Sequence, residues 1–420
     1  MKTALVVVSA ALVGAAAVSV PLKSQTPAAG AIVYEGARVI VGDGSAPIEN
    51  AAFVVEGTRI TQVGRAGQVK TPAGATRVSL AGKTVMPAII DTHTHMGETR
   101  EAVVELLQRK AYFGVGAVLS LGTDPGNIAF TLRDERIPNG ARLLTAGRGI
   151  TMPEPGRSEV PYWVSTEAEA RNAVRELAAQ KVDIVKIWVD DRNGKYKKLT
   201  PELYTAVIEE AHKHGLRVTA HVYYLDDAKG LLKAGVDAFA HGVRDQDVDD
   251  GFLAMVKARP DFVLVPNLPD RGVVTDVSWL ADHVSPGELQ KLQAGAAKAR
   301  PAAQQSFGIQ ARSLAKMNAA GVTIALGTDG GIAWSHHLEM EDMVAAGMTP
   351  QQVIVAATGD AAEFLRLKEH GTMATGKSAD FLVLDANPLD DITNTRQIAD
   401  VYLRGVRLDR AAMRTRLATP

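Results

Sequence analysis

From residue 85 onward, the chain alternates short apolar runs with longer amphipathic segments. Short apolar runs are typical of buried strands, and amphipathic segments are typical of helices that cover them. Several segments open with helix-start signals, such as Thr166, Thr200 before Pro201, and Thr349 before Pro350. Eight apolar runs occur in this part of the chain: VMPAIID, GAVLSLG, ARLLTAG, DIVKIWV, LRVTAHV, DAFAHG, DFVLVPN and VTIALGTD.

Eight strands that alternate with helices over residues 85–371 predict an α/β fold of the (β/α)8 TIM-barrel type. A doubly wound open sheet is the structural alternative. Such sheets commonly carry a glycine-rich phosphate-binding loop after the first strand. The first run here is followed by THTHMGETR, which is no such loop, and this favours the barrel.

The two ends of the chain share a different pattern. Short alternating strands and glycine-containing turns occupy residues 31–84, and the same pattern returns over residues 372–412. We therefore expect both ends to pair into one small β-sandwich domain beside the barrel.

Residues 1–24 have the layout of a secretory signal peptide and the start of a linker. Lys2 precedes an apolar run to Val20, and Ala15, Ala16 and Ala17 offer an A-x-A-like cleavage site. A retained membrane anchor is the alternative. We expect an exported protein, periplasmic or secreted, with no stable membrane anchor after cleavage.

Composition narrows the functional classes. Among 420 residues, Lys and Arg total 46 and Asp and Glu total 47, so the net charge is −1 and provides no basic excess for nucleic acid. The chain has no Cys, which excludes thiolate metal sites and cysteine nucleophiles.

Polar residues gather where the apolar runs end. His93 and His95 follow the first run, and residues at i and i+2 on a strand point to the same face. Lys186 interrupts the fourth run, where a buried amine is costly unless it is paired, neutralised or modified. His221, His241 and Asp329 end the fifth, sixth and eighth runs. Nitrogen and oxygen donors at the carboxyl ends of barrel strands indicate a site for zinc or another first-row divalent metal.

In these segments the chain resembles the metal-dependent amidohydrolase superfamily. The matching segments are VMPAIIDTHTH, IVKIWV, TAHVY, AFAHG and LGTDGG, with GTMATGKSADFLVLD as further support. More narrowly, the chain is similar to the imidazolonepropionase-like and Xaa-Pro dipeptidase-like branch, which includes an ochratoxin-hydrolysing enzyme. The resemblance covers about residues 31–410.

The resemblance implies a binuclear hydrolase that cleaves an amide bond of a dipeptide or N-acyl amino acid. One metal ion would be held by His93, His95 and Asp329, and the other by His221 and His241. Lys186, carboxylated by carbon dioxide, would bridge them. A hydroxide shared by the two ions would attack the amide, with Asp329 as general base and then general acid.

Two alternatives remain open. The first is a mononuclear cyclic-amide hydrolase or deaminase of the same fold, but such relatives usually carry a Glu near the fifth strand, and residues 222–227 read VYYLDD. The second is an exported metal- or solute-binding protein without catalysis, which would need no general base.

Substrate contacts are expected from the loops at the same barrel face. In dipeptidase-like relatives a Tyr two residues after the fifth-strand His contacts the substrate carboxylate, and Tyr223 matches that position. Arg244 is a candidate clamp for a carboxylate. His336, in the loop after the last strand, is a candidate substrate contact. The substrate would be a small amide or dipeptide, and the resemblance is compatible with a homo-oligomer.

Overall fold

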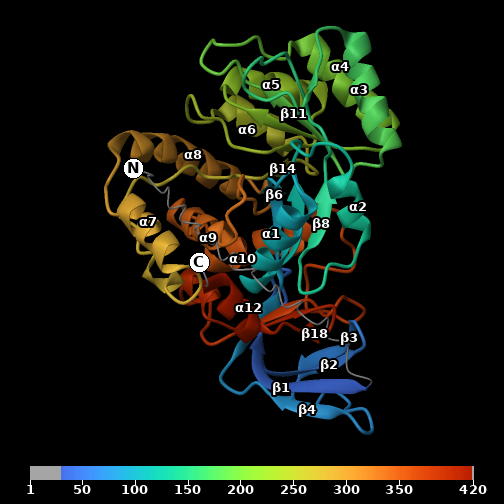
Figure 1. Ribbon diagram of the computed structural model, residues 1–420, viewed down its shortest axis with the longest axis vertical. Coiled ribbons are helices and arrows are strands. Elements are labelled where there is room, and N and C mark those ends of the chain that lie inside the picture. The colour runs from blue at the N-terminus through green and yellow to red at the C-terminus, as the bar shows by residue number, and fades with distance from the viewer. Residues whose placement is uncertain (1–29, 419–420) are drawn as a thin grey trace, which may run out of the picture.

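The computed structural model describes residues 30–418, so the predicted signal peptide lies outside the described residues. The chain has a mixed α/β fold in which a body of parallel strands and helices stands on a sheet built from both chain ends (Figure 1). Within the described residues, no helix combines the length and apolar character that a membrane span requires.

Each of the eight predicted apolar runs contains a parallel strand. Two short strands, β9 (Ile150–Thr151) and β10 (Tyr162–Trp163), lie in the segment between the third and fourth of these strands. The eight strands are β6 (Ile89–Thr94), β7 (Val115–Ser120), β8 (Arg142–Thr145), β11 (Val185–Val189), β12 (Val218–Val222), β13 (Ala238–Phe239), β14 (Val263–Leu264) and β15 (Thr323–Ile324).

Strand pairing does not close these strands into the predicted barrel. β6, β7 and β8 form one sheet, and β10-β9-β11-β12-β13-β14-β15 form another. β9 occupies the place beside β11, with Ile150 opposite Ile187, and β15 at the far edge spans two residues. Backbone hydrogen bonds bridge the two gaps: Asp183 N donates to Thr145 O at 3.0 Å, and Thr92 N donates to Leu326 O at 2.9 Å.

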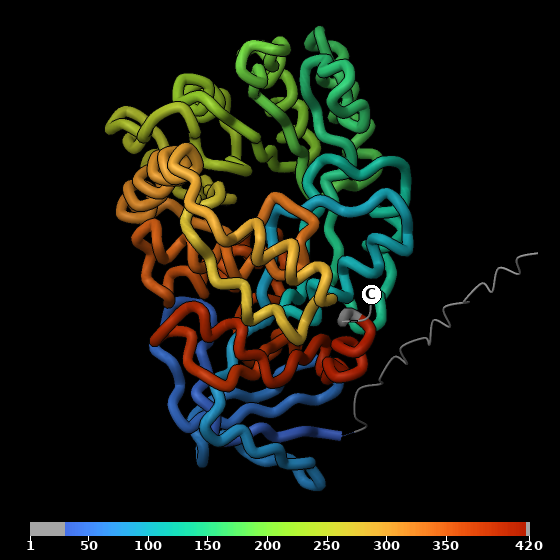
Figure 2. Tube along the Cα trace, turned by 60° about the vertical axis from the view of Figure 1, so that its left-hand side comes forward, coloured from blue at the N-terminus to red at the C-terminus, as the bar shows by residue number. Residues whose placement is uncertain are grey.

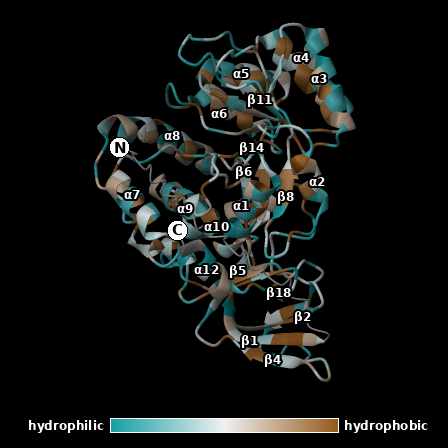
Figure 3. Ribbon diagram, in the orientation of Figure 1, coloured by the Kyte–Doolittle hydropathy of each residue, from teal (hydrophilic) through white to brown (hydrophobic). Residues whose placement is uncertain are grey.

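The helices between the strands bury apolar faces in a shared core and keep polar residues outside (Figure 3). Thr166 and Thr349 form the capping boxes expected of such N-terminal residues. The helices are α1 (Arg100–Tyr112), α2 (Ile128–Asp134), α3 (Glu167–Ala179), α4 (Pro201–Lys213), α5 (Leu225–Ala234), α6 (Asp250–Lys257), α7 (Pro286–Ala296), α8 (Pro301–Ala319), α9 (Ser335–Ala345), α10 (Pro350–Ala357), α11 (Gly359–Phe364) and α12 (Arg410–Ala418), with 3-10 turns η1 (Ser278–Leu280) and η2 (Ile392–Arg396).

The two chain ends share one sheet of eight strands, and both views show their segments side by side (Figures 1 and 2). Its order is β18-β17-β16-β5-β1-β2-β3, with β4 paired to β1. The strands are β1 (Ala31–Val39), β2 (Ile48–Glu56), β3 (Arg59–Arg65), β4 (Thr76–Ser79), β5 (Thr84–Pro87), β16 (Phe381–Leu384), β17 (Ile398–Leu403) and β18 (Val406–Arg407).

This sheet does not confirm the separate two-layer sandwich that the sequence predicts. β5 pairs with β1 on one side and with β16 on the other, which joins the two halves into a single sheet. Aromatic packing supports that junction. The ring centroid of Phe381, from the C-terminal half, lies 5.4 Å from that of Tyr34 and 5.2 Å from that of Phe53, both from the N-terminal half.

Residues 371–378 read GTMATGKS, which has the spacing of a phosphate-binding loop. That function requires a loop that follows a strand and opens a helix. Here the segment follows α11 and leads into β16, and the Lys377 ammonium donates to the carbonyl of Lys368 at 2.6 Å. The spacing therefore occurs in the wrong structural context.

A buried ion pair ties α1 to the start of the parallel sheet. Lys110 Nζ lies 2.6 Å from Asp91 Oδ2, and neither side chain has exposed surface. Asp91 also accepts hydrogen bonds from the Thr328 hydroxyl at 2.8 Å and the His93 backbone N–H at 3.2 Å. This carboxylate thus connects β6 to the segment that follows β15.

Lys110→Ala should lower the free energy of unfolding by about 3–5 kcal/mol, because it leaves the Asp91 charge buried without its partner. Denaturant unfolding with a metal chelator present measures this loss without a contribution from bound metal. Arg100→Ala is the matched control, since it breaks the solvent-exposed pair with Glu135 and should cost about 1 kcal/mol or less. Equal losses in both variants would contradict this role for Lys110.

Candidate metal-dependent active site

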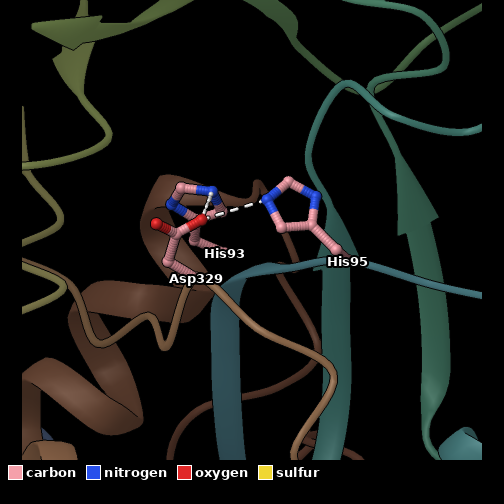
Figure 4. Close-up of side chains that lie close together, drawn as sticks. All are labelled: His93, His95 and Asp329. Atoms are coloured by element: carbon pink, nitrogen blue, oxygen red, sulfur yellow. Dashed lines mark hydrogen bonds and ion pairs between the residues drawn. The ribbon is translucent and has the colours of Figure 1, made fainter. Parts of the chain in front are cut away.

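His93, His95 and Asp329 converge at one point above the parallel strands (Figure 4). The Nε2 atoms of both His rings lie 3.0 Å from Asp329 Oδ1. Asp329 has a left-handed backbone (φ 51°), and its N–H donates to the carbonyl of His93 at 2.7 Å. The candidate ligand atoms of these three residues all lie within 4.8 Å of one another.

A row of adjacent imidazole rings extends from this point across the site. The ring centroids of His93 and His241 are 5.1 Å apart, and those of His241 and His221 are 4.7 Å apart. His241 Nε2 lies 3.4 Å from Asp329 Oδ2. The structure therefore brings together the four His residues predicted as metal ligands with the predicted Asp.

Lys186 is fully buried in β11, and its Nζ has no hydrogen-bond partner among the described residues. Two glycines make room for this segment. A Cβ on Gly122 would lie 2.8 Å from Lys186 Cγ, and a Cβ on Gly149 would lie 2.1 Å from a ring carbon of Trp188. Burial lowers the pKa of Lys186 to about 7, although Asp329 opposes the shift.

Burial also sets the protonation of the other groups. It lowers the pKa of His221 to about 3, and it lowers the pKa of His93 and of His241 below the usual value. Burial alone would raise the pKa of Asp329, but His93 and His241 hold it below its usual range. Neutral imidazoles and an ionised carboxylate are the forms that bind metal ions.

Two polar side chains that the sequence analysis did not select orient the first two His rings. His93 Nδ1 lies 2.9 Å from Asn267 Oδ1 and 3.2 Å from the carbonyl of Ala240. His95 Nδ1 lies 2.9 Å from the Thr123 hydroxyl. Donation from each Nδ1–H would leave Nε2 deprotonated and directed at the shared point. Asn267 is the last residue of the run DFVLVPN. A polar side chain at the end of an apolar run is the sequence feature that could have identified it as a site residue.

Asp190 is a further residue that the sequence analysis missed, although it directly follows the fourth apolar run. Its Oδ2 lies 2.8 Å from His221 Nε2 and 2.6 Å from an amino group of Arg192. Burial would raise the pKa of Asp190, but hydrogen bonds from His221 and Arg192 hold it below its usual range. Because Nε2 of His221 is occupied, Nδ1 is the nitrogen left to face a metal ion.

Of the predicted substrate contacts, Tyr223 and Arg244 lie on the segments after β12 and β13, close behind His221 and His241 in the chain. The N–H of Arg244 donates to the carbonyl of Tyr223 at 2.8 Å, which joins the loops after β12 and β13. The Nε of Arg244 is buried without a hydrogen-bond partner among the described residues. Burial lowers the pKa of Arg244, while Asp329 and Asp190 act in the opposite direction.

The structure does not support a substrate contact by His336. Its side chain has no exposed surface, and its Nε2 lies 2.9 Å from the carbonyl of Phe113. α9 begins at Ser335, and its first turn directs this ring into the core rather than toward the mouth of the site. A position in the loop after a strand therefore does not ensure exposure.

The donor set fits divalent metal ions. Lys186 Nζ is buried and has no hydrogen-bond partner among the described residues, which is costly unless another group satisfies it. Two neutral imidazoles and one carboxylate at a single point match the ligands of a catalytic zinc site, which keeps a further position open.

Comparisons with known proteins agree with this chemistry. The model of the amidohydrolase family matches residues 84–408. The ochratoxinase of Aspergillus niger is 27% identical over 425 residues, which cover 86% of this chain and 82% of that protein. The imidazolonepropionase of Deinococcus radiodurans is 26% identical over 397 residues, which cover 86% and 92%. A Xaa-Pro dipeptidase structure with bound methionine has the same fold, with a TM-score of 0.72, 22% identity, and coverage of 90% of this chain and 100% of that one.

Asn267→Gly should weaken metal binding about 10–100-fold, because it removes the group that orients His93. Glycine tolerates the left-handed backbone of Asn267 (φ 43°), so the loss reports on the side chain. Competition with a chromophoric zinc chelator measures the affinity. Asn139→Gly, at another left-handed Asn (φ 54°), should leave the affinity unchanged. Unaltered affinity in Asn267→Gly would show that His93 needs no such support.

Proposed function

The chain belongs to the amidohydrolase family, whose members are hydrolases of carbon–nitrogen bonds, and we propose that it is a binuclear enzyme cleaving N-acyl amino acids or dipeptides. The row of four imidazole rings carries this proposal, together with the buried, unpartnered Lys186 amine, whose charge acts on both His93 and His221. The names of the ochratoxinase relative and of the Xaa-Pro dipeptidase structure support an amide substrate.

His93, His95 and Asp329 would hold one divalent ion, and His221 and His241 the other, with zinc as the expected metal. Lys186 would bridge them as a carbamate, formed when its neutral amine adds to carbon dioxide and loses one proton. The buried amine, with its pKa lowered to about 7, supplies that neutral form. When bound, the ions would polarise the scissile carbonyl and lower the pKa of a bound water.

The two oxygens of Asp329 have different surroundings. Oδ1 lies 3.0 Å from both His93 and His95, whereas Oδ2 lies 3.4 Å from His241 alone. We therefore assign ligation to Oδ1. Oδ2 would accept a proton from the attacking water and return it to the leaving amine.

Tyr223 and Arg244 would bind the free carboxylate of the amino acid that leaves. Both stand on the loops after β12 and β13, and the unpartnered Arg244 Nε supplies a buried cationic donor there. Charge-assisted hydrogen bonds to a carboxylate are stronger than neutral ones.

A mononuclear cyclic-amide hydrolase is the second candidate. It is favoured by the His93, His95 and Asp329 group, which forms a site by itself, and by the imidazolonepropionase relative. Elemental analysis separates the candidates, since the first requires about two metal equivalents and the second about one.

Tyr223→Phe should lower kcat/KM for N-acyl amino acids with a free carboxylate by roughly 10–150-fold, because this is the effect expected from losing one charge-assisted hydrogen bond. The corresponding amidated substrates should be poor for the native enzyme and little affected by the change. Tyr224→Phe is the control, because that hydroxyl donates to Asp191 at 3.0 Å instead. Equal rates of the native enzyme on free acids and amides would reject the proposed substrate class.

Asp329→Asn should reduce kcat by roughly 10²–10⁴-fold, the usual value of a positioned general acid–base. The amide keeps the size of the side chain and one coordinating oxygen, so the purified variant should retain substantial metal. Measuring the metal content together with turnover separates the loss of the general base from a loss of metal. Near-native turnover would place the base elsewhere.

Lys186→Ala should reduce the metal content from about two equivalents to about one, because it removes the bridging group. Elemental analysis after desalting measures this directly, and added short-chain carboxylic acids should restore part of the activity. Lys257→Ala, at an exposed position on α6, should keep both equivalents. Full metal content in Lys186→Ala would exclude a bridging role.

A further inference from the structure

A pocket of about 470 Å³ opens directly beside His95. Its walls come from the segment after β6, from α1 and α7, and from the loop that connects β15 to α9. His95 lines this pocket, and its Nε2 is 3.0 Å from Asp329, so the pocket adjoins the point where the proposed ligands meet. Its volume falls within the range of small-molecule sites.

The inner wall of this pocket is apolar. Met96 and Leu106 are half-buried and pack against the main core, and the Trp334 ring is buried. Ile332 is 51% exposed, one of the large hydrophobic side chains that the described residues leave open to solvent. An apolar wall with an exposed hydrophobic residue, next to reactive polar groups, is typical of a subsite for an apolar part of a ligand.

The charged groups of the pocket do not favour an anion. Arg109 lies 5.8 Å from the Trp334 ring centroid, 3.9 Å from Glu105 and 3.5 Å from Glu288. Two carboxylates therefore surround the one guanidinium, and the lining has an excess of negative charge. A carboxylate end of the substrate belongs instead at Arg244, which follows β13 and is not part of the pocket lining.

We infer that this pocket binds the acyl side of the substrate and selects aromatic or branched aliphatic acyl groups. The inference rests on the proposed function. With the amino acid carboxylate at Tyr223 and Arg244, after β12 and β13, the scissile amide lies over the ligands and the acyl group extends toward the loops after β6 and β15. The substrate class is thus an N-acyl amino acid or dipeptide with a bulky apolar group on its acyl side.

Two substrates test this assignment: the N-acetyl and the N-(3-phenylpropanoyl) derivatives of one amino acid. The native enzyme should favour the phenylpropanoyl substrate by at least about tenfold in kcat/KM, since even one methylene group in an apolar pocket can contribute that much. Ile332→Asp should reduce this ratio at least about tenfold, because it places a charge in the apolar wall. Ile332→Leu should retain it.

Val274→Asp is the matched control, an exposed aliphatic side chain (66%) outside the pocket lining, and it should keep the native ratio. Binding of 3-phenylpropanoate and acetate to the metal-loaded protein, measured by calorimetry, is the second readout. Preference for 3-phenylpropanoate that disappears in Ile332→Asp supports the pocket even without turnover, in which case the proposed function alone fails. Equal binding of both acids by the native protein, or an unchanged ratio in Ile332→Asp, overturns the inference.

Discussion

Six ionisable side chains from the parallel strands and the segments that follow them meet at one site, and the four that are buried must be neutral or paired, which constrains the rest of the structure. His93, His241 and Lys186 are almost fully buried, and burial lowers the pKa of each. Ionised Asp329 is the one carboxylate among them. Neutral nitrogen donors buried beside one ionised, partly exposed carboxylate are the forms of these groups that bind a metal ion.

The polar residues around the cluster are arranged to hold its geometry. Asp91 binds Lys110, Thr328 and the backbone of His93, so one buried carboxylate joins β6, α1 and the segment that carries Asp329. Asn267 extends this support to the segment after β14, and Asp190 positions His221. These side-chain links hold the segments after the short strands in place, because the candidate ligands are cross-linked beyond the strand pairing.

The two sides of the site offer different chemistry to a substrate. The loops after β12 and β13 present a phenol and a guanidinium, whereas the segments after β6 and β15 present Met96 and Ile332. An amide bond with a carboxylate on one side and an apolar group on the other matches this polarity. Hydrolysis of that bond would release an amino acid on one side and a carboxylate with an apolar tail on the other.

The sequence by itself predicted most of the strands and helices, and it selected the candidate ligands that the structure brings together. Apolar runs predict strands because the requirement to bury them is local, the spacing of His93 and His95 follows from the strand repeat, and Lys186 is conspicuous because an amine in an apolar run is costly. Only the tertiary structure decided the rest. The pairing of β5 with both β1 and β16, the contacts of Asn267 and Asp190, and the burial of His336 depend on distances between segments far apart in the chain. Periodicity describes which face of an element is buried, but it does not encode which distant residue lies against that face.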